Sequence, residues 1–340
     1  MKTALIRRLG LVLAATLCLS LVGCTEPVDQ PTPEVPQATS TTVGLTFIPN
    51  IQFAPFYIAE KNGFTGDYEH IDNVEVTLRH HGAGEGLFTA LAAGDEDFVV
   101  AGGDEILEAR TQGIDLVAVA SYYGQYPVRF IVPEGSDIAS VADLRGHSIG
   151  LPGRFGENWY ALLIALNEAG LTEEDVEIVE IGYTHQVALT TGQVDAVVGF
   201  ANSDVINFQT AGFPVTVIDP EVPLVSICLA TTRAYAEANP KIVGHVIAGM
   251  KAGMRAAIDD TEGTLTIAAD YIPSFRGETV DAARVVLPAT AALFVDDAGK
   301  VSPELNPGQW TRMAEAMTAV GLIPEGTDAS LAFSNDYLLS

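Results

Sequence analysis

From residue 43 onward, short apolar runs alternate with segments whose apolar residues recur at helical spacing. The apolar runs are rich in Val and Ile and are bounded by Gly, Pro, Asn or Asp, which is the pattern of buried strands. Ten strands are expected, at 43–47, 74–78, 98–101, 115–120, 128–132, 148–151, 176–181, 194–198, 215–218 and 225–230. Helices are expected between them, at 53–62, 84–93, 104–111, 159–169, 186–191 and 203–209.

After Arg233 the pattern is helical to the end of the chain, with breaks expected at Pro240, Pro273 and Pro307 because proline does not continue a helix. Strands that alternate with helices through short Gly-rich connections predict an α/β fold, with mainly parallel sheets flanked by helices. In open α/β sheets, ligands bind at the loops beyond the carboxyl ends of the strands. Functional side chains are therefore expected in these loops.

The N-terminus has the pattern of an export signal. Three basic residues precede an apolar run at 9–22, and this run of about 14 residues is shorter than the roughly 20 that a membrane-spanning helix needs. The run ends in Leu21-Val22-Gly23-Cys24, which resembles a bacterial lipobox, in which the Cys is lipidated after cleavage. The alternative is an ordinary signal peptide with an incidental Cys. We predict cleavage of 1–23, export, and anchoring to the outer face of the cell membrane through a lipidated Cys24.

The segment 24–42 is rich in Pro, Thr, Gln and Glu, which predicts an extended tether between the anchor and a globular body. After cleavage and lipidation, Cys228 is the single cysteine left to the body. It lies in an apolar run, so a buried structural role is expected rather than a reactive one.

Composition and charge narrow the class of partner. The chain has 340 residues, 48% of them hydrophobic, with 44 acidic against 17 basic residues and a formal net charge of −27. This is too apolar for a disordered chain, and its length allows two domains with an ample core. Binding to a phosphate backbone needs clustered Lys and Arg, so nucleic acid is excluded as a main partner. Contact with the membrane is expected through the lipid anchor only.

Catalytic and metal-binding motifs are missing or out of context. The sequence has no Walker A loop and no His-Glu-x-x-His helix. Gly146-His147-Ser148-Ile149-Gly150 matches the nucleophile elbow, but here the Ser opens a predicted strand instead of ending one. His80-His81 has no further His or Cys at ligand spacing, which favours a polar strand end over a metal site. We expect a protein that is not an enzyme and has no catalytic residue, no metal and no cofactor.

The loops after the predicted strands carry aromatic rings, amides and carboxylates. A planar heteroaromatic ligand needs rings to stack on and polar groups beside them to fix its edge. The alternative for any one of these rings is a place in the core. The candidate ligand-binding residues are Asn50, Phe53, Tyr57, Glu85, Asp104, Tyr122, Tyr123, Phe155, Glu157, Asn158, Trp159, Tyr183, Phe200, Asn202 and Asp204.

Three stretches carry a resemblance to a known family. The segment 46–63, with Ile48-Pro49-Asn50 and Phe53-Ala54-Pro55-Phe56-Tyr57, resembles the opening of periplasmic binding proteins of the thiamine-pyrimidine, sulfonate and riboflavin type. Asp143-Leu144-Arg145-Gly146 is similar to that family's entry into its second lobe, and 192–202 resembles a later strand and loop. The resemblance covers about 43–239.

This resemblance implies a two-lobed, type II periplasmic binding protein fold with a ligand cleft between the lobes. Lobe one would comprise 43–125 plus 225–340, and lobe two 126–224. Such proteins are substrate-binding lipoproteins of ABC importers, which deliver a small molecule to a membrane permease driven by a cytoplasmic ATPase. The chain is expected to act as a monomer, and closure of the lobes would supply affinity and the signal to the permease.

The residue types in the loops bear on the ligand. Sulfonate, taurine or nitrate calls for Arg, Lys or free helix N-termini, whereas Arg154 is the one base among the candidate loops. Carboxylates accept hydrogen bonds from ring N–H, amino or hydroxyl groups. Within the family this implies riboflavin or a thiamine pyrimidine precursor, with riboflavin favoured because aromatic residues are numerous. A sulfonate, taurine or nitrate binding protein of the same fold remains an alternative.

Two alternatives come from other classes of protein. A eukaryotic branch of the fold is an enzyme that makes the thiamine pyrimidine with a Cys-rich iron motif and a pyridoxal-bearing Lys, and this chain has no such Cys cluster. A sensor receptor shares the fold but signals to a kinase. An adjacent permease and ATPase gene would distinguish import from sensing.

Overall fold

The computed structural model describes residues 39–64, 74–82, 85–296 and 298–338. In this part of the chain, ten strands form two five-stranded sheets, and each predicted strand overlaps an observed one. The predicted signal peptide, Cys24 and most of the predicted tether lie outside the described residues. None of the described helices combines the length and the hydrophobicity that crossing a membrane requires.

The first sheet combines four strands from the start of the body with one from much later in the chain. Its strands are β1 (Thr39–Leu45), β2 (Val74–His80), β3 (Phe98–Gly102), β4 (Leu116–Ser121) and β10 (Ile227–Thr232). Their order is β2-β1-β3-β10-β4. β1 runs parallel to β2 and β3, whereas β10 runs antiparallel to both of its neighbours.

The second sheet repeats this arrangement within one continuous stretch of chain. Its strands are β5 (Val128–Pro133), β6 (Ser148–Leu151), β7 (Glu177–Glu180), β8 (Ala196–Phe200) and β9 (Val215–Ile218). The order is β7-β6-β8-β5-β9, with β6 parallel to β7 and β8 and with β5 antiparallel to both neighbours. One strand in each sheet opposes the others, so the prediction of two mainly parallel sheets is confirmed.

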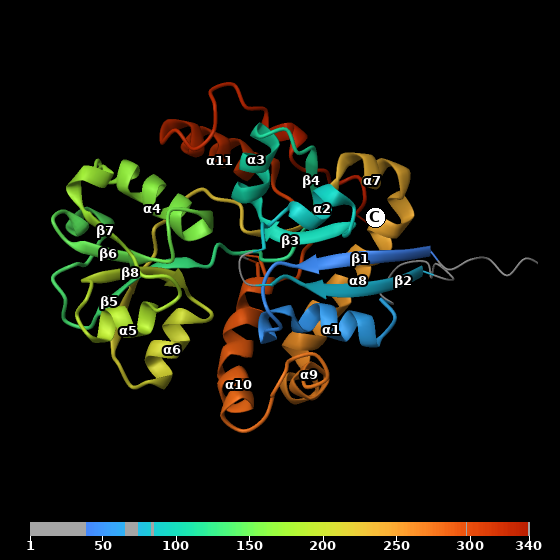
Figure 1. The fold of residues 1–340 in the computed structure, drawn as a ribbon, viewed down its shortest axis with the longest axis horizontal. Helices are drawn as coiled ribbons and strands as arrows, with labels where there is room; N and C mark the ends of the chain where they lie inside the picture. Colours follow the sequence, from blue (N-terminus) through green and yellow to red (C-terminus); the bar gives the residue numbers. More distant parts are fainter. Residues whose placement is uncertain (1–38, 65–73, 83–84, 297, 339–340) are drawn as a thin grey trace, which may run out of the picture. The chain divides into compact units, whose positions relative to one another are not determined.

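Helices cover both faces of each sheet. Figure 1 shows α1 and α8 on one side of the first sheet and α2 and α3 on the other, while α4 lies across the second sheet from α5 and α6. The α-helices of the described residues are α1 (Ala54–Lys61), α2 (Thr89–Ala93), α3 (Gly103–Thr111), α4 (Gly156–Glu168), α5 (His185–Thr190), α6 (Asp204–Thr210), α7 (Arg233–Ala238), α8 (Pro240–Asp259), α9 (Thr261–Ala268), α10 (Glu278–Ala291) and α11 (Pro307–Ala319).

Alternate residues of β3 pack on opposite faces of the first sheet. Phe98 and Val100 belong to the hydrophobic cluster that contains α1 and α8, whereas Val99 and Ala101 belong to the cluster that contains α3 and α11. All five residues of β3 are buried, which explains why the sequence presents this strand as an unbroken apolar run.

Several predicted boundaries differ from those of the structure, and two of the differences are large. β1 begins at Thr39 rather than at residue 43, because Thr39–Thr42 continue the parallel register with Val74–Thr77. The last four residues assigned to the tether are therefore part of a strand. The helix expected at 84–93 begins only at Thr89, since the glycines that precede it, such as Gly86, disfavour helix.

The predicted breaks in the C-terminal helical region fall where prolines stand. Pro240 and Pro307 occupy the first positions of α8 and α11, where the missing backbone N–H has no cost. Pro273 lies between α9 and α10. Pro288 stands inside α10, a position that the sequence pattern did not single out.

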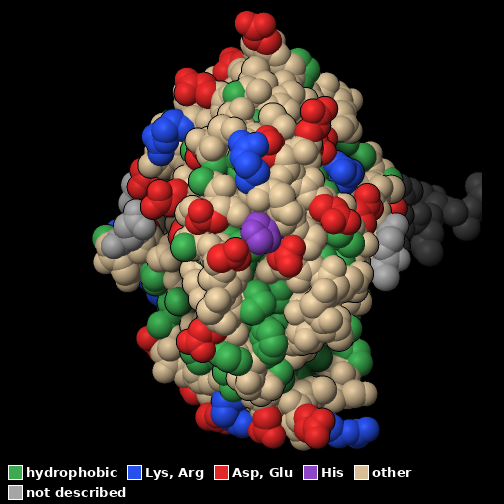
Figure 2. Space-filling view, turned by 90° about the vertical axis from the view of Figure 1, so that its left-hand side faces the viewer, with side chains coloured by type: hydrophobic (Ala, Val, Ile, Leu, Met, Phe, Trp, Pro, Cys, Tyr) green, Lys and Arg blue, Asp and Glu red, His purple; other side chains and the backbone are tan. Residues whose placement is uncertain are grey.

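The acidic excess lies on the surface. On the face shown in Figure 2, Asp and Glu side chains are spread widely, and Lys and Arg side chains stand among them. Solvated charge of this kind favours solubility and does not determine the fold.

Two glycines on one face of α8 bring that helix into backbone contact with its neighbours. A Cβ on Gly249 would lie 2.8 Å from the Cβ of Phe64. A Cβ on Gly253 would lie 2.7 Å from the carbonyl carbon of Pro55 in α1 and would overlap its oxygen. The close contact of α1 and α8 therefore depends on Gly253 having no side chain.

We predict that Gly253→Ala destabilises the protein, because the added methyl group meets rigid backbone and forces the two helices apart. The expected loss in the free energy of unfolding is about 1–3 kcal/mol. Denaturant unfolding measures it, with Gly308→Ala in α11 as the control, since the nearest atoms to a Cβ there are at 3.4 Å. The control is expected to change stability by less than about 0.5 kcal/mol. Equal stabilities of both variants and wild type would contradict this packing.

Candidate ligand-binding site

A cavity of about 400 Å³ opens at the carboxyl ends of strands from both sheets. The first sheet contributes residues that follow β1 and β4 and residues at the end of β3, and the second contributes residues that follow β6, β7 and β8. This is where ligands bind in open α/β folds. The volume falls within the roughly 300–1,000 Å³ of small-molecule pockets.

Most of the candidate residues from the sequence line this cavity. They are Asn50, Phe53, Tyr122, Tyr123, Phe155, Glu157, Asn158, Tyr183, Phe200, Asn202 and Asp204. The structure thus brings together residues that lie up to 154 positions apart (204 − 50). Their contact with a ligand stays a prediction.

Two aromatic candidates lie outside the lining. Tyr57 is fully buried in α1, where its ring stacks on Tyr271 with centroids 4.4 Å apart, and its hydroxyl donates to the carbonyl of Asn50 at 3.2 Å. Trp159 packs in the hydrophobic core under α4, with the Arg154 guanidinium 4.9 Å from its ring centroid. Tyr57 therefore supports the loop that carries Asn50, and Trp159 supports α4.

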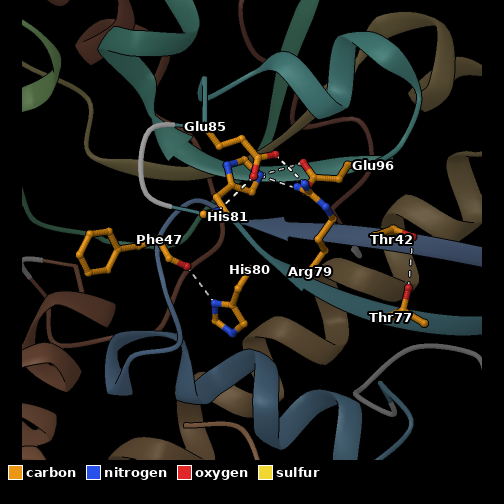
Figure 3. A network of polar contacts seen from close by, with 9 residues as sticks. Thr42, Phe47, Thr77, Arg79, His80, His81, Glu85 and Glu96 are labelled. Atoms are coloured by element: carbon orange, nitrogen blue, oxygen red, sulfur yellow. Dashed lines mark hydrogen bonds and ion pairs between the residues drawn. The ribbon is translucent and has the colours of Figure 1, made fainter. Parts of the chain in front are cut away.

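Glu85 does not line the cavity but forms an ion pair beside it. Figure 3 shows its carboxylate pointing toward Arg79, whose guanidinium lies between two acids. The Arg79 nitrogens are 2.6 Å from Glu85 Oε1 and 2.6 Å from Glu96 Oε1. The buried Glu96 also meets His81 Nε2 at 2.9 Å. This network joins the end of β2 to the turn before β3 and gives Glu85 a structural role beside the cavity.

The two adjacent histidines each have their own partners. His80 Nδ1 lies 2.9 Å from the carbonyl of Phe47, and its Nε2 lies 3.0 Å from the hydroxyl of Tyr57. His81 is bound to Glu96. Across the described residues, no group of three or more His, Cys, Asp or Glu side chains is placed to hold a metal ion.

Buried aromatic rings form one wall of the cavity. Tyr122 and Tyr123 stack with centroids 5.1 Å apart and 19° between their planes. The Tyr122 hydroxyl donates to the carbonyl of Gln52 at 2.6 Å, which ties this wall to the loop after β1. Phe53 adds a third buried ring.

Exposed aromatic rings stand at the mouth. Tyr183 is 72% exposed and Phe155 is 58% exposed, although both line the cavity. Phe47, from the opposite sheet, has its ring centroid 6.3 Å from that of Tyr183. Exposed rings beside a cavity are available to stack on the flat face of a ligand.

Three carboxyl groups meet beside the aromatic wall. Asp104 and Glu105 lie in the first turn of α3, and Glu157 lies in the first turn of α4. Gly102 makes room for them, because a Cβ there would lie 3.2 Å from Glu105 Oε2, 3.2 Å from Glu157 Cγ and in overlap with Asp104 Oδ1. The Tyr126 hydroxyl lies 3.1 Å from Asp104 Oδ2 and 3.1 Å from the Glu157 carbonyl. We refer to Asp104, Glu105 and Glu157 as the carboxyl cluster.

The carboxyl cluster holds its protons more tightly than carboxyl groups in water. Burial raises the pKa of Asp104 well above its ordinary value, and the nearby Glu105 adds to this. Burial likewise raises the pKa of Glu157, together with the negative charges of Asp104 and Glu105. Burial raises the pKa of Glu105 from 4.5 to about 7. A protonated carboxyl group both donates and accepts, so the cluster offers both kinds of hydrogen bond near neutral pH.

Four buried polar atoms of the lining have no hydrogen-bond partner in the protein. They are Glu157 Oε1, Asn158 Oδ1, His185 Nε2 and Asn202 Oδ1. Their residues are each 7% exposed or less. An unpaired buried polar atom costs about 1–3 kcal/mol, so it is rare unless something else satisfies it. Their concentration in one cavity is the property expected of a polar ligand site.

The partners of two of these side chains fix their orientation. His185 Nδ1 lies 3.5 Å from Asp204 Oδ1, and Asp204 Oδ2 accepts the backbone N–H of Phe200 at 2.8 Å. Asn202 Nδ2 donates to Thr290 Oγ1 in α10 at 3.0 Å. Each side chain is thus held at one atom and open at another, which is preorganisation for a ligand.

Sequence reasoning missed several lining residues, of which Phe47, Glu105 and His185 matter most. Phe47 was assigned to the end of the first strand, but β1 ends at Leu45. Glu105 follows the candidate Asp104, and His185 begins α5 two positions after the candidate Tyr183. All three residues stand within or next to the predicted loops at strand ends. Including every polar or aromatic residue of those loops would have identified them.

The fold agrees with that of solved binding proteins. The periplasmic aliphatic sulphonate binding protein SsuA from Escherichia coli superposes with a TM-score of 0.67 at 19% sequence identity, over 89% of this chain and 94% of SsuA. Two mixed sheets with helices on their faces and a cavity at the strand ends define the type II periplasmic binding protein fold. The resemblance inferred from the sequence, to substrate-binding proteins of ABC importers, is confirmed.

The sequence comparisons establish the family. The model of the "NMT1/THI5 like" family matches residues 50–263, and the chain belongs to this family. The riboflavin-binding protein RibY of Chloroflexus aurantiacus is 29% identical over 338 residues, 96% of this chain and 95% of RibY. The 4-amino-5-hydroxymethyl-2-methylpyrimidine phosphate synthase of Schizosaccharomyces pombe is 21% identical over 88% of this chain and 87% of the synthase.

We predict that the carboxyl cluster makes the unliganded protein less stable as the pH rises. The folded protein binds the Glu105 proton with a pKa of about 7 and the unfolded chain with a pKa of 4.5, so stability is greatest below the lower value. The free energy of unfolding should fall by about 1–3 kcal/mol between those pH values.

Denaturant unfolding from about pH 5 to about pH 8 tests this, with wild type compared to Glu105→Gln. In Glu105→Gln the free energy of unfolding should fall much less with rising pH, because the Gln amide does not titrate. Glu75→Gln, an exposed residue of the edge strand β2, is the matched control and should follow wild type. The same pH dependence in wild type and Glu105→Gln would show that Glu105 does not carry the effect.

Proposed function

We propose that this protein is the solute-binding component of an ABC importer and that it captures a planar heteroaromatic, vitamin-type solute, riboflavin in the first place. The observation that carries the proposal is the set of four unpaired buried polar atoms in a cavity with aromatic walls. Stacked rings would bind the faces of a flat ligand, and the polar atoms would bind its edge.

The polar atoms suit a ligand with hydrogen-bond donors. Asn158 Oδ1 and Asn202 Oδ1 are acceptors that need an N–H or O–H group, and the Glu157 carboxyl group, whose pKa burial raises, can donate as well as accept. Riboflavin has an N–H on its ring system and several hydroxyl groups on its side chain. This match, together with the similarity to RibY over nearly the whole chain, supports riboflavin.

A thiamine pyrimidine precursor is the second candidate. Its amino group and hydroxymethyl group are donors, and its ring is flat. The similarity to the pyrimidine phosphate synthase of Schizosaccharomyces pombe supports it, but at lower identity than RibY. The number of aromatic rings around the cavity exceeds what a single pyrimidine covers, and this favours riboflavin.

The lining argues against the alternative of a sulfonate, taurine or nitrate ligand. Such anions are bound by Arg, Lys or free backbone N–H groups. None of the cavity-lining residues in the described chain is Lys or Arg. Similarity of fold to SsuA at 19% identity does not transfer its ligand.

The enzyme alternative lacks its Cys cluster. The body has Cys228 as its single cysteine, and burial raises the pKa of this thiol, which keeps it protonated and unreactive. A sensor receptor would use the same cavity, and the presence of adjacent permease and ATPase genes would favour import over sensing.

Capture would be coupled to delivery through movement of two lobes. We infer that 43–125 with 225–340 forms one lobe and 126–224 the other, because the cavity is lined from both sheets. A solute that binds residues from both lobes stabilises the closed state, and a permease can recognise that state. The protein would act as a monomer with the permease and its ATPase as partners.

Binding of riboflavin is the experiment that tests the function. The purified full-length protein, unfolded and refolded to remove bound solute, should quench flavin fluorescence on titration. At 100 times its dissociation constant, riboflavin should stabilise the protein by about 2.7 kcal/mol in thermal unfolding. Stabilisation by taurine or nitrate, with none by riboflavin or the aminopyrimidine, would contradict the proposal.

The variant Tyr183→Ala tests whether riboflavin binds at the mouth of the cavity. Loss of ring stacking should weaken riboflavin binding about 2- to 10-fold, and unliganded stability should change little because Tyr183 is exposed. Val187→Ala is the matched control, since Val187 is 60% exposed on the adjacent α5 and does not line the cavity. Equal affinities of the two variants would exclude a stacking role for Tyr183.

We further propose that the protein is exported and held at the outer face of the cell membrane by a lipid on Cys24. Cys24→Ala should move the protein from the membrane fraction to the soluble fraction, because two acyl signals are lost with that residue. Cys228→Ala is the control and should stay with the membrane. Unchanged fractionation of Cys24→Ala would contradict the anchor.

A further inference from the structure

We propose that the cavity selects uncharged solutes and rejects those that carry a phosphate or sulfonate group, so that it takes the free vitamin and not its phosphate ester. This inference rests on the proposed function and adds the charge class of the ligand to it. It follows from the basic residues, the helix starts and the carboxyl groups around the cavity.

The basic side chains beside the cavity are already neutralised. Arg154 directly precedes the lining residue Phe155, but it pairs with Glu173 and lies over the Trp159 ring. No cation of the described lining is therefore available to an incoming phosphate.

Carboxyl groups stand at three of the four helix starts that border the cavity, those of α3, α4 and α6, while α5 begins with His185. Anions bind readily at helix N-termini, and a carboxyl group in the first turn disfavours a second negative charge there. At α3, Glu105 Oε2 accepts the N–H of Gly102 at 3.0 Å, and Asp104 Oδ1 accepts the N–H of Glu105 at 2.8 Å. At α6, Asp204 Oδ2 accepts the N–H of Phe200 at 2.8 Å. At α4 no side chain caps the backbone N–H groups, and Glu157 lies in the first turn.

The cavity therefore presents acidic groups where a phosphate-binding site presents positive ones. Glu105, Glu157 and Asp204 line it, and the buried Asp104 lies with Glu157 beside Gly102. A phosphate placed here adds negative charge beside Asp204 and the partly ionised Glu105, in a place with little water to screen it. Two of the four unpaired lining atoms are the amide oxygens of Asn158 and Asn202, and a deprotonated phosphate oxygen has no hydrogen to give them.

Paired titrations test the inference. The full-length protein is titrated with riboflavin and with riboflavin 5′-phosphate by flavin fluorescence, and with the aminopyrimidine and its phosphate ester by thermal shift. Each phosphate ester is expected to bind at least about tenfold more weakly than its parent. In Glu105→Gln this ratio should shrink by about threefold or more, whereas Glu75→Gln, which removes the same charge from the edge strand β2, should keep the wild-type ratio.

The outcomes separate this inference from the proposed function. Equal binding of a parent and its ester would overturn the selection for uncharged ligands and leave the proposed function intact. The ester could bind more weakly than its parent while the ratio of the two affinities is the same in Glu105→Gln as in Glu75→Gln. That result would mean that the shape of the cavity rejects the ester, and it would overturn the electrostatic explanation. Tighter binding of an ester would also overturn it. If neither member of either pair binds, the proposed function fails, and this inference fails with it.

Discussion

The site depends on buried polar atoms that the protein leaves without partners. Most buried polar groups in folded proteins are hydrogen-bonded, because each unpaired one costs about 1–3 kcal/mol. Glu157 Oε1, Asn158 Oδ1, His185 Nε2 and Asn202 Oδ1 depart from this rule within one cavity. No other protein group bonds to these atoms, so solvent in the cavity is their alternative partner to a ligand. Affinity for a donor-bearing solute therefore depends on how well its polar groups replace that solvent.

The fold supplies the means to hold such atoms in place. Strand ends of both sheets bring α3 and α4 together at Gly102, where a side chain of any size would displace the carboxyl cluster. Outside the cavity, ion pairs and hydrogen bonds satisfy the polar groups, as in the network of Arg79, Glu85 and Glu96 (Figure 3). Ser226 Oγ and Trp310 Nε1 are also unpaired outside the cavity, but only in the cavity do several such atoms of the described residues come together.

The sequence predicts the strands well and the site partly, for physical reasons. Buried strands appear as unbroken apolar runs bounded by turn residues, and loops after parallel strands collect at one edge. The rotation of a helix about its axis is harder to predict. Glu157 and Asn158 face the cavity, but Trp159, one position on, is turned by about 100° into the core. Because apolar residues surround this turn on several sides, its pattern did not show which residue faced the ligand.

The most direct test of the account is an experimental structure of the protein crystallised with riboflavin. The account predicts that the flavin occupies this cavity, with its polar atoms about 2.7–3.2 Å from Glu157 Oε1, Asn158 Oδ1 or Asn202 Oδ1 and with its ring stacked on an aromatic side chain of the lining. A flavin bound elsewhere, or one bound here with all three oxygens still unpaired, would contradict it.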